Sequence, residues 1–375
     1  ILYVAVATLG ILYKDICWSL FFRIMPTINR QFAKYSFVFL AGAILALVFG
    51  CTNDHPQSTF DTVGPVSESQ ALIFYIIMYA GLVVFVLVMA LLAYFTFKYR
   101  KRDGEEGDPE QVHGNTALEI AWTVAPALLL IAVAVPTINS LFDTTVSPEP
   151  EALTVKVTGN QWWFRFDIPE LGVVTANELH IPVGEVINIQ LDSKDVIHSF
   201  WVPKLAGKVD MIPNNDNTMW FQSNEEGIFY GQCAEFCGES HALMRFRVVV
   251  DSKEEFDAWV ESQLLDAVKP SDPLSQQGHD LFMSSEAGCY ACHTIRGSQK
   301  AYGEVGPELT HFASRLQILA GIMDNTHENL ISWLTDPDEL KPGNTMAKNA
   351  SVYNDPDKAL SGSEIIALAS YLRSL

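Results

Sequence analysis

The chain has 375 residues, of which 49% are hydrophobic and only 18% are charged, and its formal net charge is −20. This composition, with a mean hydropathy of +0.15, excludes an intrinsically disordered chain. The negative charge argues against a nucleic-acid-binding protein and favours a basic partner. Residues 1–145 carry a charge of −3, residues 146–269 carry −11 and residues 270–375 carry −6. The low charged fraction therefore indicates membrane segments in the first part, whereas the acidity belongs to the later parts.

An export signal is expected before Cys51. A basic stretch with Arg30 and Lys34 precedes an uncharged run at residues 35–50. A basic stretch, an apolar run of this length and small residues before a cysteine are typical of a lipoprotein signal peptide. We therefore expect residues 1–50 to be an upstream segment and a lipoprotein-type signal peptide, with a lipidated cysteine after it. A plain membrane helix with an incidental cysteine is the alternative.

Two long apolar runs predict a transmembrane hairpin within residues 51–145. The first run, residues 71–97, exceeds the ~20 residues needed to cross the hydrocarbon core. The second helix is expected at residues 118–142, and its two prolines would kink it rather than break it. The loop between the runs opens with lysines and arginines directly against the membrane, which places this loop in the cytoplasm. Everything after the hairpin therefore faces the outside.

Residues 146–268 have the pattern of an all-β domain. The stretches TVKVTG, VINIQL and RFRVVV are rich in apolar and β-branched residues, and turns with Gly, Pro and Asn separate them. This pattern predicts a β-sandwich or barrel of about 100 residues. A helix over residues 253–265 is expected to close the domain.

One loop of this domain gathers soft metal ligands. It reads GQCAEFCGESHALM and contains Cys233, Cys237, His241 and Met244, while His198 lies at the start of an earlier strand. Two thiolates, imidazoles and a thioether suit copper in an electron-transfer site. A disulfide between the two cysteines is one alternative, because the domain is expected to be exported. A zinc site is another, although the methionine adds nothing to zinc.

The last part, residues 269–375, has helical periodicity and a haem signature. Cys289-Tyr-Ala-Cys292-His293 is a C-x-x-C-H motif, in which two thiols attach the haem vinyl groups and the histidine ligates the iron. The opposite ligand is expected from Met346, because KPGNTMAKN is a Gly/Pro loop ahead of the final helices. Methionine ligation also gives a higher potential. The other candidates are Met323, His311 and His327, and the two histidines are expected at the surface.

Two helices frame this C-terminal part. The first is expected to begin near Pro273. The second is predicted by a capping box, in which Ser361 is followed three positions later by Glu364, and by apolar residues on one helical face.

Together these motifs resemble cytochrome c oxidase subunit II with a cytochrome c domain fused after it, as in the caa-type haem-copper oxidases. The resemblance covers residues 51–375. It rests on the metal-ligand loop, on the segments EIAWTVAP, GNQWWFRF and DVIHSFWVP, and on the C-x-x-C-H motif, in the family's order. It implies a multidomain fold with a two-helix transmembrane hairpin, an all-β cupredoxin domain and an all-α class I cytochrome c domain. It also implies a bacterial cytoplasmic membrane, with both later domains on its outer side.

The resemblance implies a covalent haem c and a binuclear copper A centre, whose two coppers are bridged by both cysteines of the loop. The other copper ligands would be His198, His241, Met244 and the backbone carbonyl of Glu235. The Glu235 side chain would also reach a magnesium or manganese ion shared with subunit I, and a merely solvated acid is the alternative. Two thiolates shared between two coppers suit the passing of electrons rather than the turnover of a substrate.

Two further positions have roles implied by the family. Glu119 matches a glutamate at the mouth of a proton channel into subunit I, and simple interfacial solvation is the alternative. Trp162, Trp163 and Phe164 match the aromatic patch that receives the electron, with Phe164 standing where many members carry a tryptophan.

The implied function is an electron relay with no catalytic residue on this chain. A soluble or membrane-bound cytochrome c, or a bc-type complex, would reduce the haem, the haem would reduce the copper pair, and subunit I would reduce oxygen to water with proton pumping. Subunit III is a further implied partner, and the fused haem weakens the need for a basic one. The copper A subunit of a nitric oxide reductase and an exported copper-binding or assembly protein are the alternatives. A quinol oxidase subunit II shares the hairpin and sandwich but lacks the copper ligands.

Overall fold

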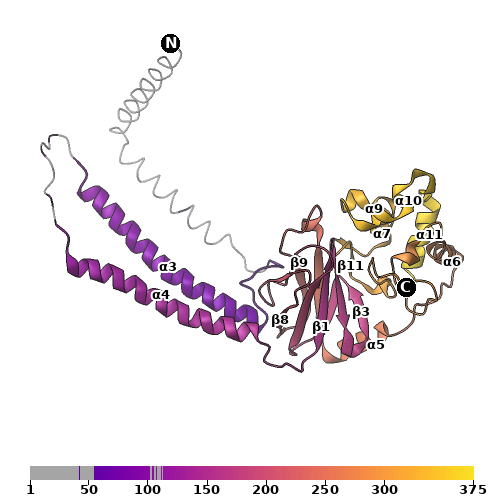
Figure 1. Ribbon diagram of the computed structural model, residues 1–375, viewed down its shortest axis with the longest axis horizontal. Helices are drawn as coiled ribbons and strands as arrows, with labels where there is room; N and C mark the ends of the chain where they lie inside the picture. The colour runs from indigo at the N-terminus through magenta and orange to yellow at the C-terminus, as the bar shows by residue number, and fades with distance from the viewer. Residues whose placement is uncertain (1–41, 43–54, 102–103, 105–106, 108–110, 112) are drawn as a thin grey trace, which may run out of the picture. The chain divides into compact units, whose positions relative to one another are not determined.

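The computed structural model describes residues 42, 55–101, 104, 107, 111 and 113–375. The predicted signal peptide and Cys51 lie outside the described residues, so their assignment stays a prediction. From the hairpin onward, the described chain forms two long helices, two β-sheets and then a series of short helices (Figure 1). We call residues 146–268 the β domain and residues 269–375 the C-terminal domain, after the predicted borders, which we retain as our proposal.

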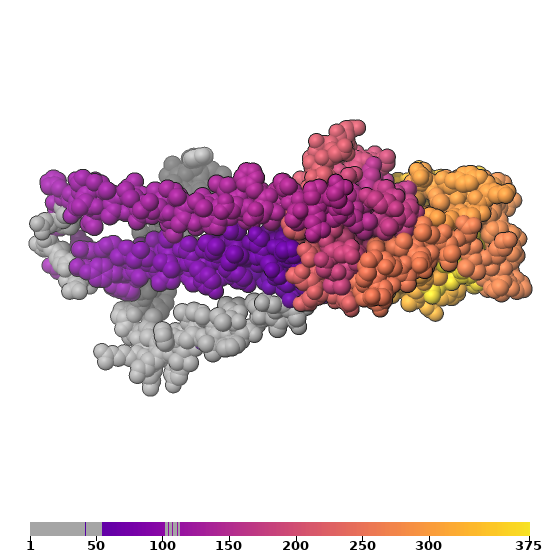
Figure 2. Space-filling view, turned by 90° about the horizontal axis from the view of Figure 1, so that it is seen from below, coloured from indigo at the N-terminus to yellow at the C-terminus, as the bar shows by residue number. Residues whose placement is uncertain are grey.

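The hairpin consists of α3 (Pro65–Lys98) and α4 (Thr116–Thr145), which run side by side (Figure 1, Figure 2). The Asn115 side chain caps α4 by accepting hydrogen bonds from two backbone N–H groups of its first turn. Both helices are long and apolar enough to cross a membrane, and their apolar side chains are exposed on all sides. Such a surface requires lipid or other subunits around it. Both helices are several residues longer than predicted, because their polar end turns continue the helix.

The β domain is a sandwich of two five-stranded sheets. One sheet has the strand order β3-β2-β1-β5-β8 and the other has the order β4-β10-β9-β6-β7. Within them β1 pairs parallel with β5 and β10 pairs parallel with β4, while the remaining pairs are antiparallel. The strands are β1 (Thr154–Asn160), β2 (Trp163–Ile168), β3 (Val173–Ala176), β4 (Glu178–Pro182), β5 (Ile187–Ser193), β6 (His198–Trp201), β7 (Val209–Met211), β8 (Asn217–Phe221), β9 (Gly227–Cys233) and β10 (Arg245–Asp251).

Aromatic rings fill the space between the two sheets. Alternate residues of β2 are fully buried, so that Phe164 packs against Phe246 with ring centroids 4.8 Å apart, and Phe200 stacks on Phe246 at 4.6 Å. Gly231 of β9 makes room for this cluster, since an added Cβ would lie 2.2 Å from the Phe246 ring. Helix α5 (Lys253–Gln263) follows the last strand and opens with a capping box from Ser252.

The C-terminal domain is mainly helical. It contains α6 (Pro273–Phe282), α7 (His327–Thr335), α8 (Pro337–Leu340), α9 (Thr345–Asn349), α10 (Ser351–Asn354) and α11 (Gly362–Leu372). Helices α6 and α11 cross so closely at Gly278 that an added Cβ would lie 1.9 Å from the Ala367 carbonyl oxygen. The predicted capping box of Ser361 and Glu364 is present, and α6 begins at Pro273 as expected. A short hairpin of β11 (Gln317–Ile318) and β12 (Met323–Asp324) departs from a purely α-helical domain.

Candidate metal centre and haem pocket

Two paired strands and one loop of the β domain gather the predicted copper ligands. His198 is the first residue of β6 and Cys233 is the last residue of β9, and these two strands are antiparallel neighbours. Cys237 follows in the loop, His241 opens a 3₁₀ turn, and Met244 immediately precedes β10. The sheet register therefore brings a distant histidine to the cysteine loop.

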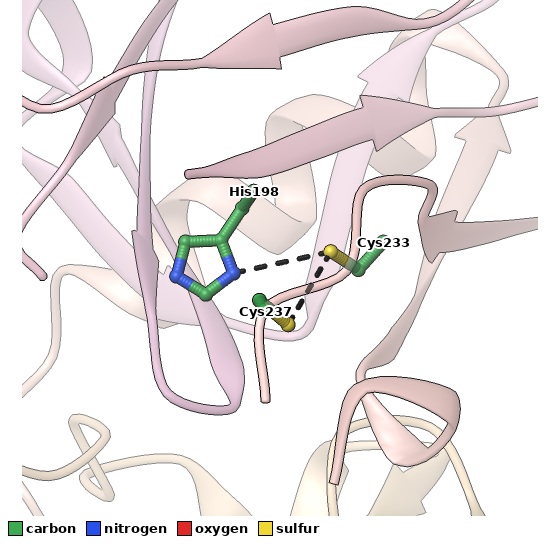
Figure 3. Close-up of side chains that lie close together, drawn as sticks. All are labelled: His198, Cys233 and Cys237. Atoms are coloured by element: carbon green, nitrogen blue, oxygen red, sulfur yellow. Dashed lines mark hydrogen bonds between the residues drawn. The ribbon is translucent and has the colours of Figure 1, made fainter. Parts of the chain in front are cut away.

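The donor atoms of all five side chains converge. The Cys233 and Cys237 sulfurs lie 3.7 Å apart, and the His198 Nδ1 lies 3.9 Å from the Cys233 sulfur (Figure 3). The Cys237 sulfur lies 3.5 Å from the His241 Nδ1 and 3.9 Å from the Met244 sulfur. The donor atoms of His198 and both cysteines lie within 4.8 Å of one another, and all three residues are buried. Such a set of soft donors around one point fits copper.

A backbone carbonyl completes this set. The Cys233 sulfur lies 3.2 Å from the Glu235 carbonyl oxygen, so this carbonyl lies beside the gathered side chains. The His198 ring packs closely against β1, because a Cβ on Gly159 would lie 2.7 Å from this ring. The free cysteines are not joined to each other in this arrangement.

Three polar groups surround the ligands. Asp195 and Gln161 were not predicted as part of the site, whereas Trp162 was predicted only as part of the aromatic patch. Asp195 accepts a hydrogen bond from the His198 Nε2 at 2.7 Å, which fixes the ring with Nδ1 toward the sulfur. The Gln161 amide and the Trp162 indole N–H both donate to the Cys237 carbonyl, at 2.7 and 3.0 Å. The spacing D-x-x-H could have indicated the first of these groups, whereas the others depend on the fold.

The surroundings of the two thiols shift their pKa values in opposite directions. The hydrogen bond from the Cys237 thiol, assisted by those from His198 and the backbone, lowers the pKa of Cys233 to about 3. Beside that thiolate, the pKa of the Cys237 thiol is raised, first through its hydrogen bond to Cys233 and then through burial. One thiol is therefore ionised at neutral pH, and a bound cation would favour the loss of the second proton.

The C-x-x-C-H motif forms one wall of an apolar cavity in the C-terminal domain. Cys289 opens a 3₁₀ turn that presents Cys292 and His293 to the same space. The His293 Nδ1 hydrogen-bonds with the Pro307 carbonyl at 2.7 Å, which leaves Nε2 free for an iron. Burial lowers the pKa of His293, so the imidazole is neutral, as a metal ligand must be. Gly306 packs against this ring, where a Cβ would lie 2.5 Å from it.

The cavity, which we call the haem pocket, also contains the predicted second ligand. Of the four predicted axial candidates, all of which the structure describes, Met346 alone lines the pocket. His327 is exposed as expected, whereas His311 is half-buried, contrary to the expectation that it lies at the surface. The residues present therefore fit a haem held by two thiols, one imidazole and one thioether.

The aromatic patch has two different environments. Phe164 is fully buried in the core of the sandwich. Trp162 and Trp163 instead line the haem pocket, together with Gln161 of the same domain. The indole of Trp162 thus reaches the copper loop through Cys237 while its residue borders the haem pocket.

The side chains of Glu119 and Glu235 have no contact with the gathered ligand atoms in the hydrogen bonds of the described residues. Glu119 is exposed in the first turn of α4, and Glu235 is partly exposed on the copper loop.

Fold and sites together define a membrane-anchored protein that carries a copper-type cupredoxin domain and a c-type cytochrome domain. Residues 56–139 match the family described as cytochrome c oxidase subunit II, transmembrane domain, and residues 170–252 match its periplasmic domain. Residues 275–375 match the cytochrome c family.

Curated relatives extend over most of the chain. It is 40% identical over 339 residues to cytochrome c oxidase subunit 2 of Alkalihalophilus pseudofirmus, covering 87% of this chain and 93% of the relative. It is 34% identical over 355 residues to cytochrome c oxidase subunit 2 of Bacillus subtilis, covering 90% of this chain and 97% of the relative. The chain therefore belongs to the cytochrome c oxidase subunit II family, whose members are parts of an oxidoreductase complex.

Two further similarities are shorter. Quinol oxidase subunit 2 of Bacillus subtilis is 33% identical over 256 residues, covering 65% of this chain and 77% of the relative. The crystal structure of the periplasmic domain of subunit II of cytochrome oxidase of Bradyrhizobium japonicum is 37% identical, covers 30% of this chain and 95% of that chain, and has a TM-score of 0.30.

Proposed function

We propose that this chain passes electrons from an external donor through a covalent haem c and a binuclear copper A centre to subunit I, which reduces oxygen to water with proton pumping. When bound, the haem and the copper pair supply one-electron chemistry that the side chains of this protein lack. The main observation in support of this proposal is the position of Trp162, which hydrogen-bonds to the copper loop and also lines the haem pocket.

The side chains of the chain hold and shield the two groups. The cysteines, His198, His241, Met244 and the Glu235 carbonyl would hold copper, while the Asp195 carboxylate orients the first of these imidazoles. Burial of these donors keeps water away, so that little has to reorganise when the charge changes. Cys289 and Cys292 would attach the haem, and His293 with Met346 would ligate its iron.

Further roles belong to the same proposal. We assign Glu235 to a magnesium or manganese ion shared with subunit I, and Glu119 to the mouth of a proton channel into that subunit. We assign electron acceptance to Trp162 and Trp163 rather than to Phe164, because the phenylalanine is enclosed in the sandwich core. The remaining proposals are a bacterial cytoplasmic membrane location, a lipidated Cys51, subunit III as a partner, and a cytochrome c or bc-type complex as donor.

Purification of the complex from native membranes tests this function. Haem staining, copper quantification and electron paramagnetic resonance should show a covalent haem on this chain and a mixed-valence two-copper signal, in a complex that consumes oxygen. A covalent haem without copper, or a single mononuclear copper, would contradict the proposed electron transfer. Consumption of nitric oxide in place of oxygen would favour the nitric oxide reductase alternative.

A further inference from the structure

The haem pocket has basic side chains but no acidic one in its described lining. Among the described residues that line it, apart from the ligand His293, Arg315 and Lys341 carry the charged side chains, and both are cations. The remaining lining is apolar or uncharged polar, with no carboxylate. A pocket with two cations and no acid is suited to an anionic ligand, since a buried charge needs a partner.

Arg315 already has a partner within the protein. Its guanidinium donates to the Glu308 backbone carbonyl at 2.5 Å and lies 3.5 Å from the Glu308 carboxylate. Glu308 does not itself line the pocket, so the carboxylate that pairs with Arg315 lies outside the pocket lining.

Lys341 has neutral partners instead. Its side chain is buried, and its Nζ donates to the Trp162 carbonyl at 2.6 Å and to the Leu319 carbonyl at 3.4 Å. None of the salt bridges among the described residues includes it. An ammonium has three N–H donors, so one remains for a further acceptor. Burial among these neutral groups lowers the pKa of Lys341 to about 7, and an adjacent anion would restore its charge.

Both basic side chains line the pocket. Leu319, which accepts a hydrogen bond from Lys341, follows Arg315 by four residues on one loop that lines the pocket. A haem c that is attached through its two vinyl groups carries two carboxylates on its opposite edge. The number and sign of the pocket's basic residues therefore match the two carboxylates of the group that the cysteines would attach.

We propose that Lys341 binds a carboxylate of the haem and at the same time holds Trp162 of the β domain. The proposal deepens the proposed function and rests on it, because it requires a haem c in this pocket. Lys341 is then a positioning residue that joins the charged edge of the haem to the copper loop, since the Trp162 indole is bonded to the Cys237 carbonyl. A cation at this edge also stabilises the reduced iron relative to the oxidised iron, and so raises the haem potential.

Redox titration of the haem c in the detergent-purified complex tests this role. Lys341→Met should lower the midpoint potential of haem c, while the covalent haem and the two-copper resonance signal stay at wild-type levels. Lys341→Arg keeps the charge and should retain a potential near that of the wild type. Lys348→Met is the matched control, because this lysine follows on the neighbouring helix α9 but is exposed, and its loss should leave the potential unchanged.

An unchanged potential in Lys341→Met would overturn the proposal, as would equal losses in Lys341→Met and Lys341→Arg or in both methionine variants. If Lys341→Met does not accumulate, Lys341→Gln takes its place with the same expected decrease. A wild-type complex that lacks haem or copper would overturn the proposed function instead, so the two failures are distinguishable.

Discussion

At the scale of single residues, the copper site depends on groups that do not themselves face the metal. Asp195 fixes the His198 ring through Nε2, and the Trp162 indole fixes the Cys237 backbone. The pKa of Asp195 is lowered, because its hydrogen bonds from His198 and from two backbone N–H groups outweigh the opposing effect of burial. The carboxylate therefore stays ionised and oriented toward the imidazole.

Replacing this carboxylate tests its role. Asp195→Asn should weaken copper binding about 10- to 100-fold, because an amide orients the imidazole less well and lowers its basicity. Competition with a copper chelator, followed by the two-copper resonance signal, measures this loss. Asp216→Asn serves as the control, since Asp216 is exposed and belongs to the same domain. Equal copper retention in both variants would show that Asp195 has no part in the site.

At the scale of secondary-structure elements, two contacts join segments that are distant in the sequence. His180 of β4 hydrogen-bonds to Asp251 of β10 at 2.6 Å and lies 3.4 Å from the Glu178 carboxylate. Glu178 in turn accepts the Leu316 backbone N–H of the C-terminal domain at 2.8 Å. The other contact is the crossing of α6 and α11 at Gly278, described above.

The His180 cluster predicts a pH dependence of stability. Burial opposes the charged imidazole, but the hydrogen bonds to Asp251 and Glu178 outweigh it, so the pKa of His180 is raised. The stabilisation is fully present below the ordinary value of about 6.5 and is lost as the pH rises through the raised value, at about 1.4 kcal/mol per unit of difference. The midpoints of thermal unfolding of the wild type and of His180→Gln should therefore converge as the pH rises above about 6.5. Parallel curves would contradict this account.

The helix crossing predicts a steric effect. Gly278→Ala should destabilise the C-terminal domain by about 1–3 kcal/mol or more, because the new methyl group meets the backbone of α11 rather than a flexible side chain. Haem staining and thermal unfolding measure the loss. Gly362→Ala on α11 is the control, since no heavy atom lies within 4 Å of its Cβ position, and it should change stability by less than about 0.5 kcal/mol. Similar effects of both substitutions would refute the close contact.

The sequence alone predicted the helices and strands whose signal lies within a short stretch of the chain. Apolar runs predicted α3 and α4, the Ser361 capping box predicted α11, and alternation predicted β1, β5 and β10. The ligands of the copper loop could be predicted because four of them lie within twelve residues. Asp195 and Lys341 were missed, because their partners come from the register of a sheet and from another domain.

At the scale of the whole molecule, residues 56–375 form one compact unit in which the two outer domains share an interface. Several hydrogen bonds besides that of Lys341 cross it, among them those from Arg247 to the Gly321 carbonyl, from the Arg245 backbone N–H to the Ala320 carbonyl and from Arg296 to the Gly172 carbonyl. Leu319, Ala320 and Gly321 all have positive φ angles, which shape the loop that accepts two of these bonds. The contact gives the haem pocket a wall from the β domain.

The β domain meets the haem pocket with uncharged residues. It carries most of the net charge of −20, yet the residues that it contributes to the pocket lining are Gln161, Trp162, Trp163, Ala176 and Asn177. The stretch KPSDP at residues 269–273 has the composition of a short linker, and from the sequence it indicates only that the two domains stay near each other. The contacting groups are scattered along the chain and have no common motif.

The central claim is that electrons travel between the two sites within this chain. Its most direct test is to reduce the haem c of the purified complex with a light-activated reductant while oxygen reduction in subunit I is blocked. Oxidation of the haem and reduction of the copper pair should then proceed at one common rate that does not depend on protein concentration. Copper that stays oxidised, or that is reduced at a rate set by protein concentration, would contradict the account.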